Sequence, residues 1–289
     1  MYEENFMLLS DGAVHQDQYV QVGSVKARYW AAGTSGPQVL LLHGIGASVE
    51  IWRGTLKALG ARHRVLALDM PGFGRSDKPA ASYSLAYLAA FVRDFVDAMG
   101  IERTSLVGHS LGGGVALRFA LDFPERLERL GLVAPAGLGR GGSPLLRMMS
   151  LPVMGELLAR PSRAGTAMLF ETATFSKGAV DDASIEEAYQ LSRLPGAKRA
   201  FLATLRALAN VFGQRSTVVG PIVDGLRSIN APTLVLWGRE DKILPSSQAA
   251  QARLITGARV EIWDSCGHLP MLEYSVAFNA SLAEFLAAR

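Results

Sequence analysis

Short runs of apolar residues alternate along the chain with longer stretches in which apolar positions recur every three or four residues. Residues 18–22 and 25–30 alternate apolar and polar positions around a Gly-Ser pair, which predicts a β-hairpin. One later run is unbroken and apolar, four more have much the same character and a sixth is similar, a pattern typical of strands covered on both faces, as in a parallel sheet. These runs are residues 39–42, 65–68, 105–107, 130–133, 233–237 and 260–263.

Helical patterns lie between the predicted strands. Residues 84–99 place Leu85, Leu88 and Phe95 on one stripe, and residues 275–288 carry a similar apolar face. Residues 111–121 and 246–255 also fit short helices. Strands that alternate with helices predict βαβ units and a mainly parallel sheet.

One long stretch interrupts this alternation. Residues 137–224 contain several helical patches and no convincing strand, and they begin with a glycine-rich connection at residues 137–144. We expect this cap segment to cover the carboxyl ends of the strands, and residues 1–136 and 225–289 to form the core domain. Helical spacing predicts that its apolar residues mostly form the interior of the cap, and that Met148, Met149 and Leu151 help to line a substrate pocket.

Composition and charge exclude several classes of protein. Among 289 residues, 49% are hydrophobic and 19% are charged, which rules out a disordered chain. The 29 basic and 26 acidic residues are interspersed, so the net charge of +3 does not indicate a nucleic-acid surface. A single cysteine, Cys266, allows no intrachain disulfide, and we expect it to be a small buried residue.

The N-terminal residues and the apolar stretches bear on location. The first seven residues carry two acids and no basic segment before an apolar run, so no signal peptide is expected. The longest apolar stretches are too short or too interrupted to span a bilayer. We therefore expect a cytoplasmic protein without stable membrane insertion. The sequence leaves its oligomeric state open.

A G-x-S-x-G pattern is the strongest chemical signal in the chain. Gly108, Ser110 and Gly112 follow a predicted strand and precede a predicted helix. A sharp strand-to-helix turn holds a serine in strained backbone, and side chains two residues on either side of it would collide. The pattern therefore predicts Ser110 as a nucleophile at the beginning of a helix.

A serine nucleophile needs a base and a carboxylate that orients the base. Of the five histidines, we expect His15 and His63 to lie on the surface, whereas His268 follows the last predicted strand. His268 is therefore the predicted base. Asp241 follows the preceding strand and is the predicted acid, with its neighbour Glu240 as the rival. The order serine, aspartate, histidine agrees with that of proteins with this type of elbow.

The oxyanion formed by attack on a carbonyl group needs hydrogen-bond donors. The backbone N–H of Leu111 follows the nucleophile directly, and the loop at residues 43–46 offers the N–H of Ile45 as a second donor. A glycine pair near residue 73 lacks the lysine of a phosphate-binding loop, and no histidine or cysteine has metal-ligand spacing. We expect no cofactor and no metal.

At this point the chain resembles the α/β-hydrolase superfamily, from about residue 18 to residue 286. The resemblance rests on His43-Gly44-Ile45-Gly46, the Asp69-Met70-Pro71-Gly72-Phe73-Gly74-Arg75-Ser76-Asp77 loop, the elbow and Gly267-His268. It implies an α/β fold with a mostly parallel eight-stranded sheet, flanking helices and a helical cap inserted after the sixth strand. It assigns the roles of nucleophile, acid and base to Ser110, Asp241 and His268.

Within the capped group, the serine at position 110 disfavours dehalogenases and epoxide hydrolases, which resemble this chain but use an aspartate there. Carbon–carbon bond hydrolases of the superfamily typically have asparagine before the serine and tryptophan after the histidine, where this chain has His109 and Leu269. We therefore expect a serine hydrolase that acts on small carboxylic esters with an apolar acyl group of short to medium length. The alternatives are a carbon–carbon bond hydrolase acting on ring-fission products and, more remotely, a hydrolase-like binding protein without turnover.

Overall fold

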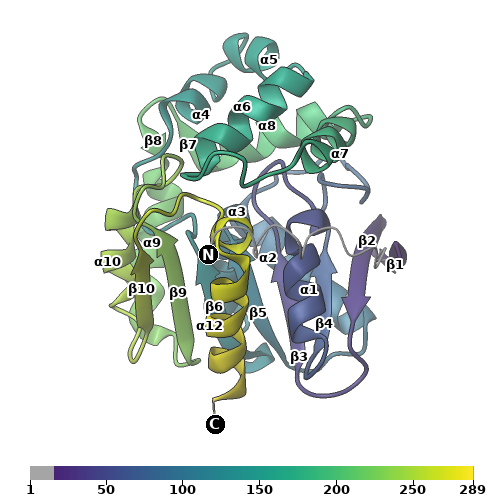
Figure 1. The fold of residues 1–289 in the computed structure, drawn as a ribbon, viewed down its shortest axis with the longest axis vertical. Coiled ribbons are helices and arrows are strands. Elements are labelled where there is room, and N and C mark those ends of the chain that lie inside the picture. The colour runs from purple at the N-terminus through teal and green to yellow at the C-terminus, as the bar shows by residue number, and fades with distance from the viewer. Residues whose placement is uncertain (1–15, 289) are drawn as a thin grey trace.

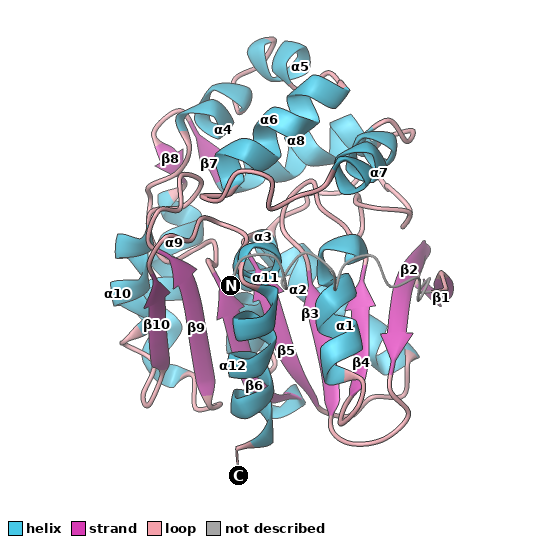
Figure 2. Ribbon diagram, viewed as in Figure 1, coloured by secondary structure: helices cyan, strands magenta, loops and turns pink. Residues whose placement is uncertain are grey.

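An eight-stranded sheet runs through the centre of the molecule (Figures 1 and 2) in the order β1-β2-β4-β3-β5-β6-β9-β10. The computed structural model describes residues 16–288. β1 pairs antiparallel with β2, and β2 pairs antiparallel with β4, whereas the remaining neighbours pair in parallel. The strands are β1 (Gln18–Val22), β2 (Val25–Ala32), β3 (Gln38–Leu42), β4 (Arg64–Leu68), β5 (Thr104–His109), β6 (Leu127–Val133), β9 (Thr233–Gly238) and β10 (Arg259–Trp263).

The predicted hairpin and all six apolar runs are strands of this sheet, which confirms the expected fold. β3, β5 and β9 are buried along their whole length, as continuous apolar runs predict. β10 differs because it is an edge strand, and its last four residues are only half-buried.

Helices cover both faces of the sheet and create two apolar cores. Leu40 and Leu42 of β3 belong to one core with α2 and α3, and Val39 and Leu41 belong to the other with α1 and α12. Successive side chains of a strand point to opposite faces, so one strand supplies both cores. The helices of this region are η1 (Val49–Trp52), α1 (Arg53–Leu59), α2 (Leu85–Ala98), α3 (Leu111–Asp122), η2 (Pro124–Arg126), η3 (Leu226–Ser228), η4 (Ser246–Gln248), α10 (Ala249–Ala252), α11 (Pro270–Glu273) and α12 (Ser275–Ala287).

The cap segment lies between β6 and β9 in the sequence and above the carboxyl ends of the parallel strands (Figure 1). Its helices are α4 (Pro144–Met149), α5 (Met154–Leu158), α6 (Arg163–Ala173), α7 (Asp182–Ser192) and α8 (Ala197–Leu208). The last helix before β9, α9 (Ser216–Gly225), returns to the core, where its Ile222 belongs to the apolar core that includes α2 and α3. It also contains a small hairpin of β7 (Ala209–Asn210) and β8 (Gly213–Gln214), where the sequence predicted no strand. Strands of two residues are too short to produce an alternating pattern.

A buried arginine connects the hairpin to the loops beneath the cap. Arg28 of β2 is 2% exposed and pairs with Asp69 Oδ2 at 3.1 Å, Glu50 Oε1 at 2.7 Å and Asp17 Oδ1 at 2.6 Å. Asp69 Oδ1 also accepts the backbone N–H of Val49 at 2.8 Å. Burial raises the pKa of Asp69 to about 6, and the adjacent guanidinium of Arg28 opposes this rise. The cluster holds together two loops, one after β3 and one after β4.

We expect Arg28→Met to lower the free energy of unfolding by about 3–5 kcal/mol, because it leaves the carboxylates of Asp69 and Glu50 buried without their cation. Urea unfolding at neutral pH measures this loss. Arg118→Met is the control, since the pair of Arg118 with Asp122 lies at the surface and should be worth less than about 1 kcal/mol. Equal losses in the two variants would contradict a stabilising role for the cluster.

Candidate active site

Ser110 sits in strained backbone between β5 and α3. Its φ of 53° and ψ of −113° lie in a region that residues other than glycine rarely adopt. A Cβ atom on Gly108 would lie 2.2 Å from the carbonyl oxygen of Gly112, and one on Gly112 would lie 2.4 Å from that of Leu42. The structure therefore leaves no room for a side chain at Gly108 or Gly112, as the G-x-S-x-G pattern predicts. Ser110 is the N-cap of α3.

His268 and Asp241 are in direct contact. His268 Nδ1 donates to Asp241 Oδ2 at 2.6 Å, and Trp237 Nε1 donates to the same oxygen at 3.0 Å. Asp241 Oδ1 accepts the backbone N–H groups of Ile243 and Leu244 at 2.7 and 2.9 Å. Four donors thus hold the carboxylate, and the proton on Nδ1 leaves Nε2 of the imidazole as the acceptor.

The rival carboxylate, Glu240, has a different partner. Glu240 Oε2 accepts the backbone N–H of Cys266 at 3.0 Å, so it supports the loop that carries His268 rather than the imidazole. Cys266 itself is fully buried, as expected, and burial raises the pKa of its thiol. A thiol that resists ionisation is a poor nucleophile.

The backbone of His268 is held on both sides. Its N–H donates to the carbonyl oxygen of Ala173, at the end of α6, at 2.6 Å. Its carbonyl oxygen accepts from Nε2 of His109 at 2.9 Å, and the two rings lie 4.6 Å apart. Burial lowers the pKa of His109 well below its usual value, so this ring is neutral. The sequence identified His109 only as part of the elbow and did not reveal that it holds His268.

Glu273 connects the His268 loop to the cap segment. Its Oε1 accepts the N–H of Gly267 at 2.9 Å, and its Oε2 accepts those of Phe175 at 2.7 Å and Ser176 at 3.2 Å. All three donors are backbone groups, which leave no pattern in the sequence. Glu273 is therefore a residue that sequence analysis missed.

The loop after β3 is oriented by a buried histidine. The N–H of Met70 donates to His43 Nε2 at 3.1 Å, so Nδ1 carries the proton and donates to the carbonyl oxygen of Gly44 at 2.7 Å. The N–H of Ala47 donates to the same oxygen at 3.2 Å. The C=O and N–H of a trans peptide point in opposite directions, so these bonds also fix the direction of the Ile45 N–H. Burial lowers the pKa of His43 to about 4.

Ser110, Ile45 and Leu111 line one small cavity, with a volume of about 60 Å³, beneath the cap segment. Ser110 Oγ and His268 make no direct hydrogen bond within residues 16–288, and catalytic hydrogen bonds are often formed only when substrate is bound. The cap contributes mainly apolar side chains to the cavity, together with polar groups of Arg147 and Gln214. Its apolar lining from the cap is Leu146, Leu205, Leu208 and Ala209.

Two expectations about the surroundings of the site are wrong. Met148 and Leu151 are 48% and 40% exposed, and Met149 is buried without lining the cavity. His63, expected at the surface, is only 5% exposed, whereas His15 lies outside the described residues. A periodic pattern identifies an apolar face but not the element that covers it.

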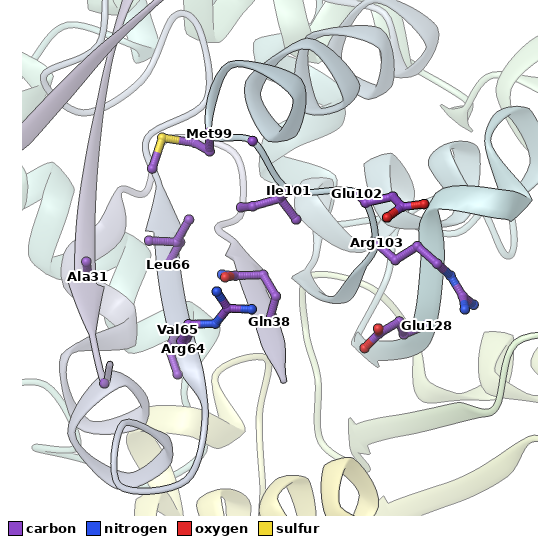
Figure 3. A pocket seen from close by; sticks show the side chains of 12 residues that line it. Ala31, Gln38, Arg64, Val65, Leu66, Met99, Ile101, Glu102, Arg103 and Glu128 are labelled. Carbon is purple, nitrogen blue, oxygen red and sulfur yellow. The ribbon is translucent and has the colours of Figure 1, made fainter. Parts of the chain in front are cut away.

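A larger cavity of about 580 Å³ lies at the other end of the strands from Ser110, where the parallel strands begin (Figure 3). Its polar and charged lining includes Gln38, Arg64, Arg103 and Glu128. None of the predicted site residues lines it. Its size alone does not make it the reactive site, because it contains no nucleophile paired with a base.

Neither a metal site nor a membrane span is found in the part of the chain that the structure describes. Residues 16–288 contain no group of three or more His, Cys, Asp or Glu side chains arranged to hold a metal ion. The helices within those residues are also too short or too polar to cross a bilayer.

Comparisons with known proteins agree with this architecture. A family model described as alpha/beta hydrolase fold matches residues 37–274. An uncharacterized protein of Mycobacterium tuberculosis is 34% identical over 98% of this chain and 85% of its own length. A 2-hydroxymuconate semialdehyde hydrolase of a Pseudomonas species is 33% identical over 88% of each chain. The crystal structure of a bacterial membrane phospholipase A is similar with a TM-score of 0.80 and 29% identity, over 94% of this chain and 86% of that one.

We expect His43 to make stability depend on pH. Its pKa is about 4 in the fold and about 6.5 in an unfolded chain, so the unfolded state binds the proton first as the pH falls. The stabilising contribution is complete above about pH 6.5 and declines toward pH 4, by at most about 1.4 kcal/mol per pH unit.

Urea unfolding of the wild type and His43→Gln at a series of pH values measures this contribution. The difference in the free energy of unfolding between the two proteins should shrink as the pH falls from 6.5 to 4.5. The other titrating groups, including Asp69, are common to both proteins and cancel in the difference. A difference that is the same at both ends of this range would contradict the assignment.

We expect Glu273→Ala to lower kcat for a test substrate about tenfold, equivalent to about 1.4 kcal/mol, with little change in KM, because the His268 loop loses its link to the cap. Glu273→Gln keeps one acceptor oxygen and should recover part of the rate. The matched control is Glu284→Ala, which removes an exposed partner of Arg259 on α12. A loss in Glu273→Ala no greater than in the control would show that Glu273 does not position the base.

Proposed function

Because the chain belongs to the alpha/beta hydrolase family, we propose that it is a serine hydrolase that cleaves carboxylic esters through an acyl-enzyme intermediate. One observation carries the proposal: a serine in a strained elbow shares a cavity wall with Ile45 and Leu111, and its neighbour His109 contacts the backbone of His268, which forms a buried pair with Asp241. Such an arrangement suits acyl transfer, which needs a nucleophile, a base and donors for an oxyanion.

The proposed reaction begins with transfer of the Ser110 hydroxyl proton to Nε2 of His268. Oγ then bonds to the ester carbonyl carbon, and the N–H groups of Ile45 and Leu111 hold the resulting oxyanion. Asp241 stabilises the imidazolium. The intermediate collapses, the bond to the alcohol breaks, and the alcohol leaves with the proton from His268. Water gives a proton to His268 and bonds to the acyl carbon. The bond between Oγ and the acyl carbon then breaks, the acid leaves, and Oγ takes the proton back from His268, which regenerates both residues.

The walls of the cavity favour a small acyl group. Leu146, Leu205 and Leu208 provide an apolar surface from the cap segment, and the volume of about 60 Å³ leaves little room for a branched or polycyclic group. We propose esters of short to medium acyl length as substrates, cleaved without a cofactor.

A second candidate function is hydrolysis of a carbon–carbon bond in a ring-fission diketo acid. Arg147 lines the cavity, where its Nε donates to the carbonyl oxygen of Val211 at 2.6 Å and holds the side chain in place. A guanidinium on the cavity wall is suited to pair with a substrate carboxylate. The similarity to a 2-hydroxymuconate semialdehyde hydrolase also favours this candidate. His109 and Leu269 stand against it, where related carbon–carbon hydrolases typically have asparagine and tryptophan.

A side-by-side assay of p-nitrophenyl esters of increasing chain length and a ring-fission dienoate tests the proposal. We expect turnover of the short esters, and we expect Ser110→Ala to lower kcat by at least about a thousandfold with an unchanged melting temperature. The removed hydroxyl contributes little packing. An active Ser110→Ala variant would exclude Ser110 as the nucleophile. If the wild type turned over none of these substrates, the result would favour the alternative of a hydrolase-like binding protein.

The same assay separates the two hydrolytic candidates. Arg147→Met should leave KM for the uncharged esters nearly unchanged. If the dienoate is the substrate, its KM should rise in Arg147→Met, and its specificity constant in the wild type should exceed that of the best ester about a hundredfold, or about 2.7 kcal/mol. That result would replace ester hydrolysis by carbon–carbon bond cleavage.

A further inference from the structure

Exposed apolar side chains are concentrated on the cap segment. Ten of the thirteen exposed large apolar side chains in residues 16–288 belong to it. Six of the ten lie close together in the sequence, from the end of α4 through α5, at the top of the cap in Figure 1. We call these six residues the apolar crest: Met148, Leu151, Val153, Met154, Leu157 and Leu158.

The backbone is strained at Val153 of the crest. Val153, between α4 and α5, has a φ of 65° and a ψ of −54°, a positive-φ conformation that β-branched residues strongly disfavour. It is also 72% exposed. Strained residues persist where the surrounding structure holds them, and they gather at functional sites. An exposed valine held in strained backbone is consistent with a binding surface and contributes nothing to the core.

Cations outnumber carboxylates in the part of the chain that carries the crest. Residues 140–177 contain two carboxylates and five cations, which are Arg140, Arg147, Arg160, Arg163 and Lys177. Arg163 is paired with Asp182 and Glu186 of α7, and Arg147 lines the cavity at Ser110. Hydrogen bonds from Arg206 hold the carboxylate of Glu156 and lower its pKa to about 2, so this acid remains ionised and paired. Arg160 lies two residues after the end of α5 and makes no ion pair within residues 16–288. The surface around the crest therefore suits an anionic partner.

We propose that the apolar crest docks on the surface of an anionic lipid bilayer. Val153 and Leu157 would enter the boundary between headgroups and acyl chains, while Arg160 would face the lipid phosphates. A second copy of the chain fits less well, because a symmetric pair would bring the same cationic surfaces together. A fluid bilayer also accepts a protruding crest without a complementary groove.

The crest is connected to the site described above. α4 places Leu146 and Arg147 on the wall of the cavity at Ser110 and Met148 on the crest. Docking would therefore place a helix that lines the cavity against the lipid surface. The docking surface goes beyond the proposed ester hydrolysis, and binding to lipid can be measured without turnover.

The test is flotation of the protein with vesicles of phosphatidylcholine alone and of equal parts phosphatidylcholine and phosphatidylglycerol. The wild type should float with the anionic vesicles and much less with the neutral ones. Val153→Asp should reduce the bound fraction about tenfold, because it places a charge in the headgroup boundary. Val276→Asp is the matched control, since Val276 is an exposed valine of α12 at 53% exposure, remote from the crest, and should bind like the wild type.

Leu157→Asp provides a second crest variant should Val153→Asp unfold, and both crest variants should hydrolyse a soluble short ester at the wild-type rate if the protein is an esterase. Absence of vesicle binding by the wild type, equal binding to both vesicle types, or the same loss in Val276→Asp would each overturn the proposal. So would a dimer, seen by sedimentation without vesicles, that Val153→Asp dissociates. Flotation of the inactive Ser110→Ala variant keeps the result independent of the chemistry.

Discussion

The close approach of β5, α3 and the end of β3 is the constraint on which the rest of the site depends. The backbones meet at distances that exclude a Cβ atom at Gly108 and at Gly112, and Ser110 takes a strained conformation with positive φ between them. This arrangement is costly, and only the fully buried strands on both sides can maintain it. In return, the hydroxyl of Ser110 is held at the amino end of a helix whose first N–H belongs to Leu111.

The opposite side of the site depends on a set of hydrogen bonds that converge on one loop. His268 is held through its side chain by Asp241, through its carbonyl group by His109 and through its N–H by Ala173. Two of these contacts come from the core and one from the cap segment, and Glu273 adds a further link between them. A movement of α6 would therefore displace the imidazole, so the cap influences the position of the proposed base as well as the shape of the cavity.

The buried titratable groups near the site differ in charge state. His43 and His109 are buried and neutral, which lets each ring act as a hydrogen-bond donor with a defined tautomer. A separate buried ion pair, between Arg28 and Asp69, lies beneath the loop that carries Ile45. In the proposed reaction His268 gains a positive charge while the substrate oxygen gains a negative one, and Asp241 stabilises the imidazolium.

The sequence by itself determined the features that depend on neighbouring residues. The apolar runs specified the strands, and the G-x-S-x-G pattern specified the elbow, because a period or a short spacing is a local property. Residue type and position after a strand were enough to nominate Ser110, Asp241 and His268. Only the tertiary structure decided between Asp241 and Glu240, since both follow the same strand and differ in which part of the His268 loop they reach. It also decided that His109 and Glu273 support this loop, through contacts with backbone groups that have no sequence signature. The exposure of Met148 and Leu151 was likewise beyond the sequence, because periodicity reveals an apolar face, whereas only the packing of other elements determines whether that face is covered.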